Sequence, residues 1–495
     1  MEEKKPKSVR KRTVSNFIWR LAERAGAQII QFIVSIVLTR LLLPEDYGTV
    51  ALVFIFTQVL QVFVESGLGN ALIQKKDADD LDFSSVFYFY MAWCLFLYAV
   101  SFFGAPFVAE FYHDESLTPI MRVLCIMIII SGLKNVQQAY VSRHLQFKKF
   151  FWATLAGTLL SGVAGIAVAM MGGGAWALVV QKLTNLAVDT LVLWFIIDWR
   201  PKLMFSFQRL KGLLSYGWKI MVPSVVDALY NNLSQVLIGK FYTPSELAYY
   251  NQGRRLPDLI VTNINTSIDS VLFPTLSREQ DDRSRVKAMT RRAIMVSTYL
   301  MAPLMMGLAF CGNTIVTLLM TEKWLPIVPF MYIFCVTSIF FPIQSANQSA
   351  IKAMGRSDLF LKFEIIKKIV GVVALLSTIW FGVYAIALSW LGVSLFSQII
   401  NAYPNRRLLG YGYLEQLKDI LPAILLAVFM GACVHCIEFL PLPLIVTLLL
   451  QLVVGAGIYL GGSKLFHMEA YSYMLDTVKS FLKKKKKDGS EESKK

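Results

Sequence analysis

Charged residues are scarce in this chain. Only 17% of its 495 residues are Asp, Glu, Lys or Arg, against about 25% in soluble domains, whereas 56% are apolar and the mean hydropathy is +0.54. This composition excludes an ordinary soluble globular protein. Cysteine is also infrequent, and the six copies all lie inside apolar runs, where a secreted disulfide framework would not place them. We therefore interpret the cysteines as small buried apolar residues.

The chain also lacks sequence motifs for catalysis, metal binding or phosphate binding. Cys433 and Cys436 have zinc-like or redox-like spacing, but they lie in an apolar run without a second ligand pair. The glycines at 172–174 are not followed by the Lys and Ser or Thr of a phosphate loop, so we interpret them as a tight turn. The four histidines have no acidic or cysteine partners at catalytic spacing. We therefore predict no catalytic residue, no metal site and no cofactor, and we expect that the protein is not an enzyme.

Long apolar runs fill most of the chain instead. A helix that spans a bilayer takes about 20 apolar residues, and turn residues and charge clusters separate the runs here. The first run has no small-residue cleavage site, so we expect it to stay in the membrane. The sequence predicts an all-α polytopic membrane protein of about 14 transmembrane helices. The predicted spans are 17–40, 47–73, 84–108, 118–141, 151–171, 175–197, 213–239, 246–273, 290–319, 325–349, 363–381, 383–403, 419–438 and 442–463.

The positions of the basic residues provide an independent test of these spans. The net charge is +16, and most of the 49 Lys and Arg fall in the two tails and the even-numbered loops. The odd-numbered loops hold only Arg40, Lys240 and Lys323. Because cytoplasmic loops carry an excess of Lys and Arg, this alternation predicts that both termini are cytoplasmic. The positive charge then reflects topology and attraction to anionic lipids, and we expect no nucleic-acid partner.

A short repeat relates the two halves of the chain. Arg40–Tyr47 reads RLLLPEDY and Lys240–Leu247 reads KFYTPSEL, so a basic residue, three apolar or aromatic residues (with one threonine), a proline and an acidic residue recur. The pairs at 79–80 and 281–282, both Asp-Asp, keep nearly the same register. Six predicted spans separate the copies, so the halves should share one orientation and be related by an axis along the membrane normal. We therefore predict two parallel six-helix lobes followed by two further helices.

The predicted organisation follows from these boundaries. It comprises a basic cytoplasmic N-tail (1–16), an N-lobe (17–197), a basic cytoplasmic inter-lobe loop (198–212), a C-lobe (213–403), two C-terminal helices (419–463) and a polybasic cytoplasmic tail (464–495). In the tail, apolar residues at mixed helical spacing precede Lys483–Lys487, which predicts an interfacial helix with a basic anchor. The alternative is a disordered solubilising tail.

Polar residues inside the first predicted span form a stripe. Arg20, Arg24, Gln28, Gln31 and Ser35 recur at spacings of three or four, which places them on one helix face. An ionisable group in a span costs about 2.5–3.5 kcal/mol on insertion scales, so this face must meet protein or water. The second half repeats the behaviour, with stripes on its first two spans. These stripes contain Lys219, Asp227, Asn231 and Gln235, and then Asn251, Arg254 or Arg255, Asp258, Thr262, Asn265 and Asp269.

We predict that these stripes line a water-filled cavity between the lobes, to which Lys134, Gln138, Lys182 and Asp189 add. The alternative is that the charges form structural ion pairs. In that interpretation Arg24 pairs with Glu23 or Glu65, Arg255 pairs with Asp258 or Asp227, and Arg20 reaches the lipid headgroups.

Four segments carry a family resemblance. They are Gly26–Gly48, Glu65–Gly69, Tyr216–Lys219 and Tyr249–Gln252. Together they resemble the polysaccharide-transporter (Wzx-type) flippases of the multidrug/oligosaccharidyl-lipid/polysaccharide exporter superfamily, over nearly the whole chain. The resemblance implies a V-shaped pair of six-helix bundles, as in the multidrug exporters of that superfamily, that alternates between inward-open and outward-open states. It also implies export of an undecaprenyl-pyrophosphate-linked oligosaccharide across the bacterial inner membrane for O-antigen, capsule or exopolysaccharide assembly, with polysaccharide polymerase machinery as a partner.

The resemblance also implies roles for individual residues. Arginines on the first and eighth helices are functional in related lipid II flippases, and the matching positions are Arg24 and Arg255, with Arg20 and Arg254 beside them. The full substrate-binding set that we predict is Arg20, Arg24, Gln28, Gln31, Lys219, Asn251, Arg254 and Arg255. Coupling to H⁺ or Na⁺ would use Glu65, Asp227 or Asp269, among which the sequence does not choose.

Three rival functions are also compatible with a polytopic membrane protein. A lipid II flippase is the nearest rival. A drug exporter of the same superfamily would more often have an acidic cavity, whereas the polar stripes here carry charges of both signs and include four arginines. A polytopic membrane enzyme of glycan assembly should have a large outer loop or a membrane-buried His or Asp motif, whereas the outer loops here are all short.

Overall fold

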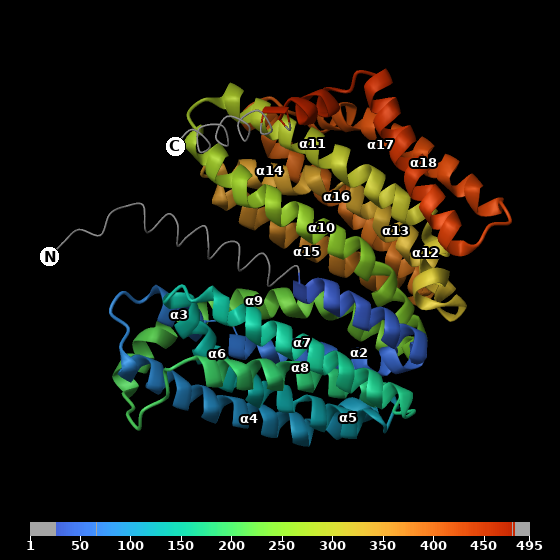
Figure 1. Cartoon of the computed structure of the whole chain (residues 1–495). Coiled ribbons are helices and arrows are strands. Elements are labelled where there is room, and N and C mark those ends of the chain that lie inside the picture. The colour runs from blue at the N-terminus through green and yellow to red at the C-terminus, as the bar shows by residue number, and fades with distance from the viewer. Residues whose placement is uncertain (1–25, 66, 478, 481–495) are drawn as a thin grey trace, which may run out of the picture. The chain divides into compact units, whose positions relative to one another are not determined.

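The computed structural model describes residues 26–65, 67–477 and 479–480, and these residues form helices joined by short loops (Figure 1). Ten helices in this part of the chain are long and apolar enough to cross a membrane, which confirms a multi-pass membrane protein. They are Pro44–Gln74, Asp80–Tyr112, Leu117–Arg143, Phe147–Met170, Ala175–Ile196, Arg283–Phe310, Glu322–Ala353, Val383–Leu409, Tyr413–Phe439 and Leu444–Leu465.

The other predicted spans also fall on helices, but these helices do not meet the same criteria. Gly26–Leu41 is short within the described residues. Polar residues keep the remaining three, α9 (Phe207–Phe241), α10 (Pro244–Arg278) and α15 (Ser357–Thr378), out of the set of ten. The total of about 14 spans therefore stays a prediction.

The chain divides into two compact units, with unit 1 ending at Ala248 and unit 2 beginning at Tyr249. The labelled helices of unit 1 are α2 (Pro44–Glu65), α3 (Leu68–Gln74), α4 (Asp80–Tyr112), α5 (Leu117–Leu124), α6 (Ile126–Arg143), α7 (Phe147–Met170), α8 (Ala175–Ile196) and α9. Helix α6 packs against α2, α3, α4 and α8. It therefore brings polar residues of the fourth apolar run beside the end of α2 and the C-terminal half of α8.

Helices α7 and α8 pack side by side along their lengths (Figure 1). Glycines permit this approach, because a Cβ at Gly157 would lie 2.9 Å from the carbonyl oxygen of Asn185, and one at Gly165 would lie 2.9 Å from Cβ of Gln181. The turn between the helices has Gly172 at φ 80° and Gly174 at φ 51°. These angles favour glycine and confirm that 172–174 is a tight turn.

Helix α9, which we predicted to open the second lobe, packs in unit 1 against α2, α3 and α4. The contact is made backbone to backbone: a Cβ at Gly217 would lie 3.0 Å from the carbonyl carbon of Gly67, whose φ is 114°. Nearer its end, a Cβ at Gly239 would lie 2.1 Å from a methyl of Leu52. The predicted lobe boundaries themselves stay a prediction.

Unit 2 begins within α10 and continues with α11 (Arg283–Phe310), α12 (Gly312–Met320), η1 (Glu322–Ile327), α13 (Val328–Ile339), α14 (Phe341–Ala353), α15, η2 (Ile379–Phe381), α16 (Val383–Leu409), α17 (Tyr413–Cys436), η3 (Ile437–Phe439) and α18 (Leu444–Leu465). Helix α11 contacts α13, α14, α16, α17 and α18, so it forms the centre of this unit. After α18, residues 469–477 are helical, which agrees with the predicted helix in the tail.

The predicted repeat has matching local structure in its two copies. Helices α2 and α10 both begin at the repeated proline. The backbone N–H of Leu43 donates to Oδ2 of Asp46 at 2.8 Å, and that of Thr243 donates to Oε2 of Glu246 at 3.0 Å. The repeated acidic residue thus caps each helix from its third position, while proline takes the first position, where no N–H is needed.

The downstream acidic pairs correspond in the same way. Asp79 caps α4 by accepting a hydrogen bond from the backbone N–H of Asp82 at 3.0 Å. Asp282 caps α11 by accepting from the N–H groups of Ser284 and Arg285 at 3.0 and 3.1 Å. These are the third helices of the two halves, so the repeat extends beyond its eight-residue signature.

One interpretation from the sequence is corrected. Cys94, Cys125, Cys311 and Cys335 are buried as expected, but Cys433 is half-buried and Cys436 is exposed. Cys436 is the last residue of α17, at the end of the helix.

Candidate functional site

The predicted polar stripe on the first span is described only in part. Arg20 and Arg24 lie outside the described residues. On the helix Gly26–Leu41, the side chain of Gln28 is half-buried and that of Gln31 is exposed.

Helix α9 presents Lys219 and Asp227 at exposed positions. Lys219 follows Gly217, the glycine at which α9 meets the backbone of the α2–α3 junction, so close packing fixes the backbone that carries the lysine.

The two neighbouring arginines of α10, Arg254 and Arg255, differ in burial and in their contacts. Nε of Arg254 donates to Oδ2 of Asp258 at 2.9 Å, and its guanidinium lies 5.9 and 5.7 Å from the ring centroids of Phe334 and Trp390. This arrangement supports a structural ion pair for Arg254. Arg255 is exposed and donates to Oε1 of Gln252 at 3.4 Å. Asn251, on the preceding turn, is half-buried.

Asp269, one of the three carboxylates predicted for ion coupling, accepts hydrogen bonds from two serine hydroxyls. Oδ1 of Asp269 on α10 accepts hydrogen bonds from Ser345 at 2.5 Å and from Ser349 at 3.4 Å, both on α14. The sequence did not indicate these partners, because they lie more than seventy residues away. Within the described part of the chain, no group of three or more His, Cys, Asp or Glu could hold a metal ion.

A polar pocket of about 480 Å³ lies within unit 1, and here several of the predicted residues do meet. Nζ of Lys134 on α6 lies 2.5 Å from Oδ2 of Asp189 on α8, and the two side chains are 16% and 11% exposed. Glu65 and Gln138 line the same pocket, whereas Lys182 packs over the ring of Phe54 at 5.1 Å. The lining residues are Glu65, Gly69, Asn70, Ile73, Ser131, Lys134, Asn135, Gln138, Ala139, Ser142, Phe150, Thr154, Leu186 and Asp189.

The pocket is shaped by a close contact between α3 and α6. Nδ2 of Asn135 donates to the carbonyl oxygen of Val64 at 2.7 Å. Its Oδ1 would lie only 2.6 Å from a Cβ at Gly69, so glycine at 69 lets α3 approach α6. This contact holds the end of α2, and with it Glu65, beside the Lys134–Asp189 pair.

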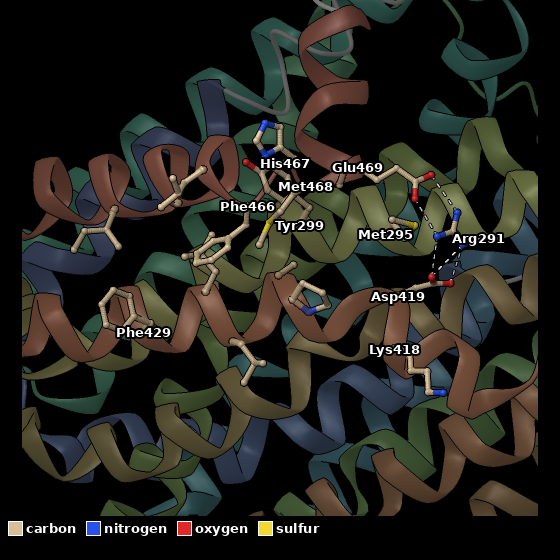
Figure 2. A pocket seen from close by; sticks show the side chains of 18 residues that line it. Arg291, Met295, Tyr299, Lys418, Asp419, Phe429, Phe466, His467, Met468 and Glu469 are labelled. Carbon is tan, nitrogen blue, oxygen red and sulfur yellow. Dashed lines mark hydrogen bonds and ion pairs between the residues drawn. The ribbon is translucent and has the colours of Figure 1, made fainter.

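A larger groove of about 930 Å³ lies within unit 2, between α11, α17, α18 and the helix that follows (Figure 2). Most of its wall is apolar, with Leu425 and Phe429 of α17 and Leu465 of α18 largely exposed.

Arg291 closes one end of this groove and was not predicted from the sequence (Figure 2). Its Nε lies 3.0 Å from both carboxylate oxygens of Asp419 on α17, and its Nη2 lies 2.9 Å from Oδ1. Its Nη1 and Nη2 donate to Glu469 at 3.1 and 3.0 Å. Oη of Tyr411 donates to Asp419 at 2.7 Å. One guanidinium thus ties α11 to α17 and to residues 469–477.

Comparison with known proteins gives a consistent result. Residues 37–329, more than half of the chain, match a family model described as polysaccharide biosynthesis protein. The chain is 25% identical over 359 residues to the teichuronic acid biosynthesis protein TuaB of Bacillus subtilis, covering 71% of this chain and 73% of that protein. It is 21% identical over 421 residues to the lipopolysaccharide biosynthesis protein WzxC of Escherichia coli, covering 83% and 85%.

Among solved structures, the fold is similar to that of the lipid II flippase MurJ in an inward closed conformation. The TM-score is 0.72 at 16% sequence identity, and the likeness covers 91% of this chain and 99% of that one.

Proposed function

Because the chain belongs to the polysaccharide biosynthesis protein family, we propose that it is a flippase for a lipid-linked oligosaccharide. It moves an undecaprenyl-pyrophosphate-linked unit across the bacterial plasma membrane by alternating access, for O-antigen, capsule or exopolysaccharide assembly. The observation that carries the proposal is the family match over residues 37–329, supported by relatives named for polysaccharide biosynthesis that align over most of both chains. The ten apolar helices support transport across a membrane.

The basic residues of α10 support recognition of the pyrophosphate. Arginine stays charged in a low-dielectric setting and offers paired donors to phosphate oxygens. Arg255 is a candidate for this contact because its side chain is exposed, and the guanidinium of Arg254, one residue before it, pairs with Asp258. In this proposal Arg254 positions α10, and Arg255 meets the substrate together with Arg24 and Arg20.

The groove in unit 2 supports binding of part of the undecaprenyl chain. Its wall is built from apolar side chains of α17 and α18, and such a groove shields an isoprenoid chain while the polar head crosses the membrane. A polyprenyl photoprobe should therefore crosslink to Leu425 or Phe429. Crosslinking spread evenly over the apolar surface would refute a specific groove.

The predicted topology completes the proposal. Both termini are cytoplasmic, the basic loops and tail attract anionic lipids, and the polysaccharide polymerase machinery receives the exported unit. The protein itself catalyses no covalent step.

The direct test is mass spectrometry of lipids from cells that lack the gene, complemented with wild-type protein, Arg255→Gln or Arg255→Lys. Without the protein, a complete undecaprenyl-pyrophosphate-linked repeat unit should accumulate. Wild type should clear it, Arg255→Gln should not, and Arg255→Lys should restore part of the activity because it keeps the charge. Accumulation of lipid II instead would assign the lipid II flippase function, and unchanged lipids would overturn the proposal.

A further inference from the structure

The polar pocket of unit 1 is larger than its ion pair requires. Its volume of about 480 Å³ lies in the range of roughly 300–1,000 Å³ that is typical of small-molecule sites. It far exceeds the roughly 10–15 Å³ needed for one water molecule. A purely structural Lys–Asp pair would be expected to sit in close packing, because empty space beside side chains forfeits dispersion contacts. The pocket therefore has room for a ligand of several heavy atoms.

Two buried atoms in its wall have no hydrogen-bond partner within the described residues. They are Oγ of Ser131, a residue that is 4% exposed, and Oδ1 of Asp189. Leaving a buried polar group unsatisfied costs about 1–3 kcal/mol, so a small side-chain rotation that lets these atoms bond to a polar ligand in the pocket would be favourable. The side-chain amides of Asn70 and Gln138 line the same pocket and add donors and acceptors.

The charges of the pocket select among polar ligands. Among the lining residues that the structure describes, three are ionisable, Glu65, Lys134 and Asp189, and their formal charges leave an excess of one negative charge. The ammonium of Lys134 is already paired with Asp189 at 2.5 Å. Within the described part of the chain, an anionic ligand would therefore meet the carboxylate of Glu65 with no further cation among the lining residues. Hydroxyl groups, in contrast, can donate to Glu65 and to Oδ1 of Asp189 and can accept from the amides.

The pocket lies toward the side on which the substrate would be loaded. In the predicted topology, the C-terminal ends of α6 and α8 are cytoplasmic. Lys134 lies nine residues before Arg143, the last residue of α6, which is roughly 14 Å along the helix. Asp189 lies about as close to the end of α8. Glu65 and Asn70, both exposed, provide an approach to the pocket.

We propose that this pocket binds one uncharged, hydroxyl-rich sugar residue of the lipid-linked glycan, an assignment that rests on the flippase function proposed above. Lys134 holds Asp189 in the wall of the pocket through Oδ2, which leaves Oδ1 without a partner among the described residues. Glu65 and Asp189 accept hydrogen bonds from sugar hydroxyls, while Ser131 and Gln138 donate to ring or hydroxyl oxygens. The pocket thereby discriminates against a uronic acid at this position of the glycan.

The test measures how much a sugar adds to binding of the carrier lipid. Purified full-length protein in detergent is titrated by native mass spectrometry with undecaprenyl pyrophosphate that is bare, or that carries a single N-acetylhexosamine or a single hexuronic acid. The variants are Ser131→Ala and Gln138→Met, which keep side-chain size nearly unchanged. The control is Thr190→Val, because the one bond of the Thr190 hydroxyl among the described residues goes to the carbonyl of Leu186 in its own helix.

The N-acetylhexosamine lipid should bind more tightly than bare undecaprenyl pyrophosphate, and the hexuronic acid lipid should not. Each pocket variant should reduce that gain by several-fold to about tenfold, the effect of one lost hydrogen bond, and leave the bare lipid unaffected. Thr190→Val should behave as wild type. If the gain survives in both variants, or if the hexuronic acid lipid binds as tightly as the neutral one, the inference is overturned while the flippase proposal stands. If no form of the lipid binds, both are overturned.

Discussion

Replacing Arg291 with methionine should lower the free energy of unfolding of unit 2 by about 3 kcal/mol. The structure indicates that most of this loss comes from the pair with Asp419 and little from the pair with Glu469. Methionine keeps much of the apolar stem, so the change removes mainly the guanidinium. Asp419 is 12% exposed and, among the described residues, would retain the hydroxyl of Tyr411 as its one remaining side-chain partner. Hydrogen bonds to charged groups contribute about 1.5–3 kcal/mol, and we assign about 2–3 kcal/mol of the loss to this pair. Glu469 is 61% exposed, so water replaces its lost partner at a cost below about 1 kcal/mol.

Double-mutant cycles separate the two contributions. Unfolding in mixed micelles is measured for Arg291→Met, Asp419→Asn, Glu469→Gln and the two double variants that contain Arg291→Met. The coupling energy should be about 2 kcal/mol for Arg291 with Asp419 and below about 1 kcal/mol for Arg291 with Glu469. A coupling to Asp419 near zero, or a larger coupling to Glu469, would show that burial does not set the strength of these pairs.

Three further predictions test the fold and the topology. Gly48→Ala should strongly reduce the amount of folded protein, because the new Cβ would lie 1.8 Å from a backbone carbonyl oxygen of the second repeat copy. Gly104→Ala should be neutral or slightly stabilising, because no atom lies within 4 Å of its Cβ position. The yield of monodisperse protein measures both effects. Asn347→Leu should cost about 3 kcal/mol in micelle unfolding, because it leaves two fully buried amides without the partner that joins them. In a background without native cysteines, Glu115→Cys should react with an impermeant maleimide in whole cells and Ser490→Cys only after lysis, and the reverse pattern would refute the predicted orientation.

The sequence predicted the helices well, because membrane spans depend on local properties. Apolar runs of about 20 residues and the charges between them place most boundaries within a few residues of those observed, as for 175–197 against Ala175–Ile196. The repeat was also readable, since proline and an acidic residue three positions after the N-cap form a local cap. The sequence predicted the eight-residue repeat at Arg40 and Lys240, and the structure adds that both copies begin a helix at their proline, Pro44 and Pro244, three and two residues before the predicted span starts at 47 and 246.

The partners of polar residues were less predictable. Periodicity places Lys134 and Gln138 on one helix face, but it does not say which helix that face meets. Asp189 was named beside them, whereas the contributions of Ser131 and Asn70 to the same pocket depend on how α3, α6 and α8 pack. Arg291 was missed for the same reason: its two carboxylates lie far along the chain.

Stability and function should separate at the Lys134–Asp189 pair. Removing one member of a mostly buried pair leaves an uncompensated charge, which typically costs about 3–5 kcal/mol, so Lys134→Met alone should unfold more readily than wild type. Replacing both, as Lys134→Met with Asp189→Leu, removes both buried charges and should restore stability to about the wild-type value or above it. If the pair served only to join α6 and α8, the double variant would also export the glycan normally. Because we assign Asp189 to the sugar, we expect the double variant to fold well and still accumulate the lipid-linked unit in cells. A double variant that is as unstable as the single one, or that is stable and fully active, would refute this separation.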